Sequence, residues 1–137
     1  MSGRLAGVRV AIVEDDALLR ESLALFLRVK GCRVDTFGSA EAAADATGPG
    51  RYHIVISDYL LPGEDGLSFL RRVMDGTRGV GTVLITAHAR ANTPRDAEAA
   101  GIDSFLLKPF STKDLEAALR RIVEGGGTKN EGIIEAI

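Results

Sequence analysis

Short apolar runs rich in β-branched residues alternate along this chain with segments whose apolar residues recur at helical spacing. This alternation is typical of a parallel sheet whose strands are joined by crossover helices. Five strands are expected, at residues 8–13, 32–37, 54–57, 80–86 and 104–107. The run at 54–57 is apolar almost throughout, as in a central strand covered on both faces. The pattern predicts an α/β fold with one doubly wound, five-stranded parallel sheet in the flavodoxin-like order 2-1-3-4-5 and five helices.

Polar residues that can cap a helix mark where most of the intervening helices begin. Asp16 and Ser39 precede the helical segments 17–29 and 40–46, and residues Leu67, Leu70, Val73 and Met74 define the third helix. Thr93 is expected as the N-cap of the fourth helix, with proline at its first position. Ser111 and Asp114 form an expected capping box before the fifth.

The chain has the length of one domain, 137 residues, and a single cysteine. We expect an N-terminal arm at 1–7, the domain at 8–124, and a glycine-rich linker with a C-terminal tail at 125–137. One cysteine, Cys32, can make neither an intrachain disulfide nor a zinc site, which favours a reducing cytoplasm.

Charge and hydropathy exclude two classes of partner. The 17 basic residues are balanced by 19 acidic ones and form no dense basic stretch, so direct nucleic-acid binding is not expected. The longest uninterrupted apolar run covers only residues 23–27, far short of the roughly 20 residues of a membrane-spanning helix.

Residues able to carry chemistry stand at the end of four of the five strands or directly after it. They are the acidic run Glu14, Asp15 and Asp16, the carboxylate of Asp58, the hydroxyl of Thr86 and the amine of Lys108. Taken singly, each has an ordinary structural role: a cap, a turn former, a β-branched strand residue and a surface amine. Together they lie where open parallel sheets bind ligands, at the carboxyl ends of the strands.

Converging carboxylates repel one another unless a cation lies among them. Mg²⁺ prefers oxygen ligands and retains several waters, so one or two carboxylates, a backbone carbonyl and a phosphoryl oxygen would suit it. Neither His53 nor His88 has a partner at metal-ligand spacing, so zinc is not expected.

Four segments in order, "VAIVEDD", "IVISDYLLPGEDG", "VLITAHA" and "DSFLLKPF", resemble the motifs of the receiver domain of bacterial two-component response regulators. The resemblance covers residues 8–123. It implies that Asp58 is the phosphoryl acceptor and that Glu14 and Asp15 hold Mg²⁺. It also implies that the backbone carbonyl of Leu60 is a further ligand of the metal.

The same resemblance gives roles to residues on the last two strands. Thr86 would donate its hydroxyl to the phosphoryl group, Lys108 would pair with another of its oxygens, and Phe105 occupies the aromatic switch position. A cis bond between Lys108 and Pro109 is expected as well. The chain departs from the common pattern by having Glu14 in place of aspartate and Phe105 in place of tyrosine.

The implied function is a signalling switch and not an enzyme acting on a separate substrate. Its phosphoryl donor would be a sensor histidine kinase or a histidine phosphotransfer protein. An effector would read the face made by the fourth helix, fifth strand and fifth helix, residues 94–123. The resemblance also leaves room for a dimer that forms on phosphorylation.

Two other functions stay open on the residues alone. Phosphatases with an aspartate nucleophile usually place a second aspartate two residues later, where this chain has Leu60, which cannot donate a proton. A receiver-like scaffold that takes no phosphate would be expected to have lost Asp58, Lys108 or an acidic residue, and all are present. A dinucleotide site is disfavoured because no glycine-rich turn follows the first strand.

Overall fold

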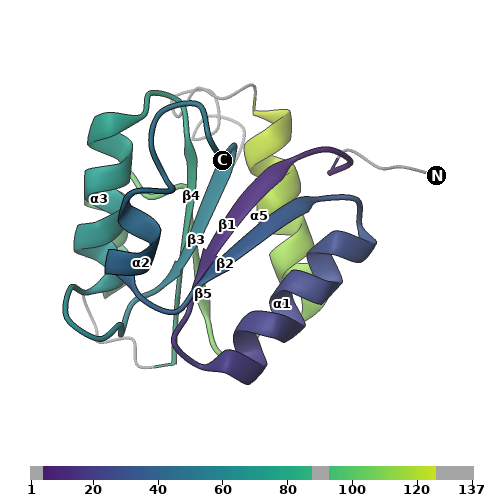
Figure 1. Ribbon diagram of the computed structural model, residues 1–137, viewed down its shortest axis with the longest axis horizontal. Coiled ribbons are helices and arrows are strands. Elements are labelled where there is room, and N and C mark those ends of the chain that lie inside the picture. The colour runs from purple at the N-terminus through teal and green to yellow at the C-terminus, as the bar shows by residue number, and fades with distance from the viewer. Residues whose placement is uncertain (1–4, 88–92, 126–137) are drawn as a thin grey trace.

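A computed structural model describes residues 5–87 and 93–125 and contains one parallel sheet in the order β2-β1-β3-β4-β5 (Figure 1). The predicted order and fold class are confirmed. The strands are β1 (Arg9–Val13), β2 (Arg33–Phe37), β3 (Ile54–Asp58), β4 (Gly81–Thr86) and β5 (Ser104–Leu107). Three strands begin one residue later than expected, and β3 includes Asp58, differences within the usual uncertainty of element ends.

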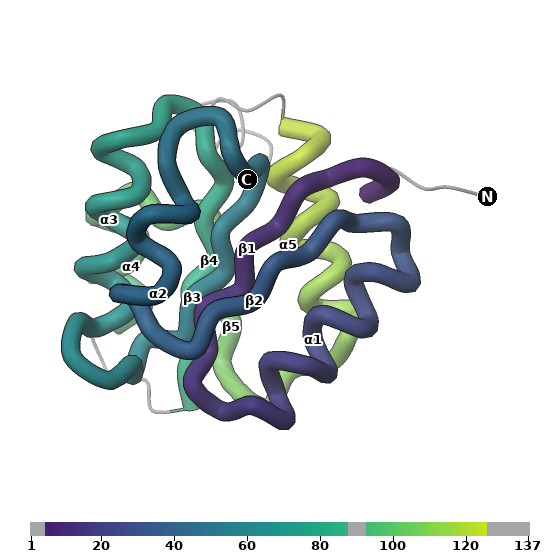
Figure 2. The backbone as a smooth tube through the Cα atoms, viewed as in Figure 1, coloured from purple at the N-terminus to yellow at the C-terminus, as the bar shows by residue number. Residues whose placement is uncertain are grey.

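Helices cover both faces of the sheet. They are α1 (Ala17–Val29), α2 (Ala40–Ala44), α3 (Gly66–Gly76), α4 (Thr93–Ala99) and α5 (Thr112–Glu124). α1 and α5 lie on one face, and α2, α3 and α4 on the other (Figure 2). None of the described helices is long and apolar enough to cross a membrane.

The central strand β3 shows why helices must cover both faces of the sheet. All five residues of β3 are buried, and successive side chains point to opposite faces. Ile54 and Ile56 belong to the core cluster shared with α1 and α5, whereas Val55 belongs to the cluster shared with α2 and α3. A run without polar alternation therefore fits this position in the sheet.

Helix starts follow the predicted caps closely. Asp16 accepts hydrogen bonds from the amides of Leu18 and Leu19 at 3.0 and 3.2 Å, and Ser39 accepts one from Ala42 at 3.1 Å. The Ser111 and Asp114 capping box is present. These interactions satisfy amides that have no partner within the helix.

Two helix boundaries differ from prediction. The prediction that α2 reaches residue 46 is wrong, because the helix ends at Ala44 and the amide and hydroxyl of Thr47 both bond the Ala43 carbonyl, closing it with a turn. The N-cap prediction for Thr93 is also wrong by one position, since this residue is the first of α4.

Residues 5–7, expected to form part of an arm, pack against the domain. Leu5 is only 2% exposed and lies in the core cluster beneath α1 and α5. The Gly7 amide donates to the Gly31 carbonyl at 2.9 Å, and the Cys32 thiol contacts the Leu5 carbonyl at 3.6 Å. The rest of the expected arm and the tail from residue 126 lie outside the described residues.

The start of α3 lies against the end of β3, and this approach requires a glycine. The Gly66 amide donates to the Tyr59 carbonyl at 2.7 Å. A Cβ at Gly66 would stand 1.8 Å from the Asp58 carbonyl oxygen, a backbone atom that cannot move aside easily. Gly66 therefore fixes the distance between the helix and the strand end that carries Asp58.

Gly66→Ala is expected to lower the free energy of unfolding by about 1–3 kcal/mol, the usual cost of inserting a methyl group into a packed site. Gly76→Ala is the matched control, because a Cβ at Gly76 meets nothing within 4 Å. The control should be neutral or stabilising by up to about 1 kcal/mol. Urea unfolding of both variants measures the difference, and equal effects would contradict the close approach.

Candidate functional site

The carboxyl ends of β1, β3, β4 and β5 meet at one edge of the sheet, and hydrogen bonds continue there beyond the strands. The Glu14 amide donates to Phe37 at 3.0 Å, the Tyr59 amide to Ile85 at 2.7 Å, and the Lys108 amide to Thr86 at 2.8 Å. The residues that follow the strands are thus held by the same ladder as the strands themselves.

Three carboxylates converge at this edge. One ligand oxygen each of Glu14, Asp15 and Asp58 lies within 4.8 Å of the others. Glu14 and Asp58 are buried, at 1% and 6% exposure, whereas Asp15 is exposed. The cluster therefore has a buried side within the protein and an open side through which a small ligand can enter.

Lys108 brings a positive charge to the buried side of the cluster. Its Nζ lies 3.0 Å from Glu14 Oε1 and 3.3 Å from Asp58 Oδ2. The bond between Lys108 and Pro109 is cis, as predicted. One ammonium group therefore bridges the carboxylates that follow β1 and β3.

Burial and charge act in opposite directions on these groups. Burial raises the pKa of Glu14, although the Asp16 amide and Lys108 both stabilise its carboxylate. Burial alone would lower the pKa of Lys108, but the carboxylates of Glu14 and Asp58 outweigh it and raise that pKa above its ordinary value. Lys108 is thus held firmly in its charged form.

The remaining predicted residues lie on β4, on β5 and in the loop after β3. Thr86 ends β4 and is fully buried, and its register partner on β5 is Leu107. Phe105 lies opposite Leu84, half-buried against the core cluster on the α2, α3 and α4 face. Leu60 lies in the loop after β3, and its side chain is 52% exposed.

Sequence reasoning gave no role to three residues that support the site. The Ser57 hydroxyl donates to the Asp58 carbonyl at 2.9 Å, and the Arg20 guanidinium donates to the Glu14 carbonyl at 2.8 Å. Gly66 packs against the same Asp58 carbonyl. Only the glycine at a helix start could have signalled its role, because a serine in a strand and an arginine in a helix are too common to stand out.

The donor chemistry of the cluster fits a hard divalent cation. All three groups are carboxylates, and Glu14, Asp15 and Asp58 offer their oxygens from two strand ends held in register. Mg²⁺ commonly binds through one or two carboxylates together with water and phosphoryl oxygens. The exposed Asp15 leaves one side of the cluster open for those further ligands.

Comparison with known proteins gives a family match across most of the chain. Residues 10–120 match the model of the response regulator receiver domain. The matched segment contains every residue of the carboxylate cluster together with Thr86, Phe105 and Lys108.

Curated relatives are transcriptional regulatory proteins of bacteria. The chain is 31% identical over 124 residues to BasR of Escherichia coli (strain K12), which covers 90% of this chain and 56% of BasR. It is also 31% identical over 134 residues to TcrA of Mycobacterium tuberculosis (strain H37Rv), which covers 98% of this chain and 53% of TcrA. The chain therefore spans about half the length of these relatives.

Solved structures share the fold. A CheY-like receiver domain protein from Methanospirillum hungatei JF-1 has a TM-score of 0.82 at 21% identity, covering 87% of this chain and 95% of that one. The BeF3-activated receiver domain of DrrB has a TM-score of 0.79 at 25% identity, covering 86% and 98% of the two chains.

Asp15→Asn is expected to weaken Mg²⁺ binding by about tenfold or more, because even residues around metal ligands typically contribute 10–100-fold. Asp16→Asn is the matched control: it removes the same charge one position along, where Asp16 caps α1 and asparagine caps equally well. Titration with MgCl₂ followed by amide NMR measures both affinities. Equal weakening of Mg²⁺ binding in the two variants would mean that Asp15 acts only through its charge and is not a ligand of the metal.

Proposed function

The chain belongs to the response regulator receiver domain family, and from this membership we propose that it is a switch controlled by phosphorylation of Asp58. The observation that carries the proposal is the position of the Asp58 carboxylate, beside Lys108 and within the cluster of Glu14 and Asp15. Asp58 is buried but lies next to the exposed side of that cluster.

In the proposed reaction, an Asp58 oxygen attacks the phosphorus of a phosphohistidine on a donor protein. The new oxygen–phosphorus bond forms as the phosphorus–nitrogen bond breaks, and the proton required by the departing imidazole comes from solvent. The product is an acyl phosphate, which water hydrolyses to restore the carboxylate. The chain acts on its own side chain, so it has no turnover on a separate substrate.

The site supplies charge stabilisation for a phosphoryl group that carries negative charge on several oxygens. Lys108 already lies 3.3 Å from Asp58 and would pair with one oxygen, while Thr86 would donate its hydroxyl to another. Mg²⁺ held by Glu14, Asp15, Asp58 and the Leu60 carbonyl would neutralise further charge when bound.

The conformational response would pass through β4 and β5. Movement of the Thr86 hydroxyl toward the phosphoryl group would leave space beside Phe105, which is only half-buried. An inward turn of Phe105 would change the face formed by α4, β5 and α5, which we assign as the surface read by the effector. Phosphate would thereby bias a two-state element.

Partners follow from family membership. The donor would be a sensor histidine kinase or a histidine phosphotransfer protein, in the cytoplasm, and a dimer could form on phosphorylation. Relatives such as BasR are about twice as long as the matched region. For this chain we propose a receiver domain at 8–124 followed by a glycine-rich linker and C-terminal tail at 125–137. Nucleic acid is not proposed as a direct partner of this domain.

Asp58→Asn is expected to abolish the phosphate adduct, because an amide is not a competent nucleophile here. The natural chain is incubated with acetyl phosphate and MgCl₂, and intact mass should show one added phosphoryl group. Asp65→Asn, at the cap of α3, is the matched control and should still be labelled. Excess chelator should prevent labelling of the natural chain.

Labelling of the Asp58→Asn variant, or undiminished labelling in chelator, would contradict the acceptor or the metal assignment. Two further outcomes correspond to other functions. Steady turnover of phosphomonoesters would indicate a phosphatase, and the absence of any adduct on the natural chain would indicate a scaffold.

Thr86→Ala is expected to uncouple the output face from the site. With beryllofluoride and MgCl₂, amide shifts of the natural chain should change around Asp58 and also at residues 97–105. The Thr86→Ala variant should keep the shift changes around Asp58 and lose most of those at residues 97–105. Thr36→Ala, on the edge strand β2, is the control and should keep both groups of shift changes. Changes confined to the loops around Asp58 in the natural chain would contradict the role of Phe105.

A further inference from the structure

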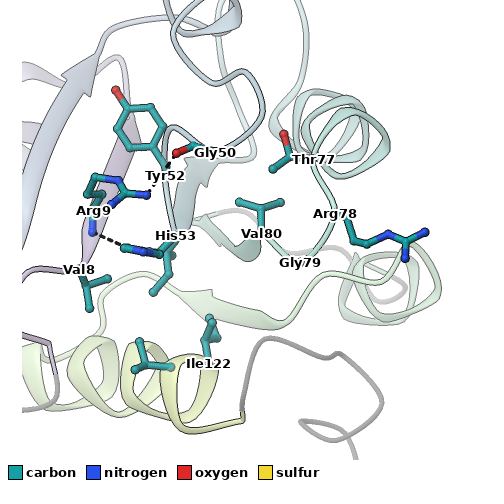
Figure 3. Close-up of a pocket in the computed structure, with 12 residues that line it drawn as sticks. Val8, Arg9, Gly50, Tyr52, His53, Thr77, Arg78, Gly79, Val80 and Ile122 are labelled. Atoms are coloured by element: carbon teal, nitrogen blue, oxygen red, sulfur yellow. Dashed lines mark hydrogen bonds between the residues drawn. The ribbon is translucent and has the colours of Figure 1, made fainter.

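A pocket lies at the end of the sheet opposite Asp58, where the strands begin (Figure 3). Its volume is about 420 Å³, within the range of small-ligand and peptide sites. Residues from the starts of β1 and β3, from the loop before β4 and from the last turns of α5 line it. This pocket is separate from the cluster at Asp58.

The pocket combines an apolar lining with a cationic rim. Val8, Ile54, Val80, Ile122 and Val123 supply apolar surface. Arg9 and Arg78 supply the positive charge, His53 accepts the Arg9 backbone amide at Nδ1, and no carboxylate is among the described lining residues. An occupant with both apolar and acidic side chains would complement such a surface.

Two polar groups of the lining would help to hold a peptide in a defined position. The Arg9 guanidinium is fixed at the rim, since it donates to the carbonyls of Arg51 and Gly50 at 2.9 and 3.2 Å. The Thr77 hydroxyl oxygen is buried and has no hydrogen-bond partner among the described residues. A buried hydroxyl without a partner is costly, and a peptide backbone can offer both a donor and an acceptor.

We propose that residues 131–137 of this chain, "EGIIEAI", dock in this pocket. The segment carries three isoleucines for the apolar lining and two glutamates, Glu131 and Glu135, for the cationic rim. The segment also lies close in sequence to the pocket, because Ile122 and Val123 line the pocket and α5 ends at Glu124.

The length of the intervening chain permits this contact. Residues 126–130 can span up to about 17 Å, at roughly 3.4 Å per residue. A short connection gives an effective concentration on the order of mM, so even a contact too weak to survive between separate molecules would be occupied within one chain. The contact lies at the sheet edge opposite Asp58 and is therefore expected to form with or without phosphorylation.

The test uses the full chain with isoleucines 133, 134 and 137 all replaced by serine. Compared with the natural chain, amide signals of Val8, His53, Ile54 and Val80 are expected to shift. Nuclear Overhauser contacts between the tail isoleucines and Ile122 should be present in the natural chain and lost in the variant. Unchanged pocket signals and absent contacts would overturn the proposal.

Charge reversal gives a second, matched test. Arg78→Glu should shift the amide signals of residues 131–137, and Glu135→Arg added to it should restore them. Arg95→Glu, on an equally exposed arginine in α4 outside the pocket, should leave them unchanged. Equal effects of the two arginine variants would overturn the assignment of the rim.

Two further measurements distinguish docking within one chain from contacts between copies and from coupling to Asp58. Shifts that grow with protein concentration would mean that the tail of a second copy occupies the pocket, which overturns docking within one chain. The Asp58→Asn variant should keep all tail contacts. Loss of those contacts would show that docking depends on the site at the other edge, contrary to the proposal.

Discussion

The bridge between Lys108 and the carboxylates of Glu14 and Asp58 is the interaction on which the site depends. A parallel sheet delivers all its strand ends to one edge, so acidic residues placed after two neighbouring strands must lie close together. Two buried carboxylates without a counter-charge would be strongly unfavourable. Lys108, at 3.0 and 3.3 Å from them, supplies that charge.

The same arrangement is suited to the proposed phosphoryl transfer. The ammonium group of Lys108 is shared between Glu14 and Asp58, so in the proposed reaction it would turn toward an incoming phosphoryl oxygen without leaving the cluster. Glu14 is anchored separately by the Asp16 amide at 3.1 Å and through its backbone by Arg20. Asp58, the proposed phosphoryl acceptor, is positioned through its backbone, because the Ser57 hydroxyl donates to its carbonyl and Gly66 packs against that carbonyl.

A further interaction holds β4 and β5 together at the end of the sheet opposite the site. Thr82 and Asp103 are joined through the Thr82 amide at 2.9 Å and the Asp103 amide at 3.1 Å, which ties the start of β4 to the turn before β5. This clamp fixes the beginning of β5 while Phe105, farther along the strand, stays half-buried. A rigid strand start beside a partly exposed aromatic residue is a suitable arrangement for a local switch.

Much of this protein is determined by local patterns in its sequence. The alternation of strands and helices, the caps at Asp16, Ser39 and Ser111, and the positions of the acidic, hydroxyl and lysine residues after strand ends all depend on nearest-neighbour chemistry. The family motifs then imply the order of the strands and the roles of Asp58 and Lys108. Such features can be predicted from the sequence because each depends on residues that are close together in the chain.

Only the tertiary structure decided which distant groups meet and how closely. Glu14 and Lys108 are 94 positions apart, and they meet because the folded sheet brings the carboxyl ends of β1 and β5 together, which no local pattern encodes. The burial of Leu5, the closeness of Gly66 to the Asp58 carbonyl and the pocket beneath α5 likewise arise from packing between elements. These distances are set by the volumes of many side chains together, so they appear only when the whole core is assembled.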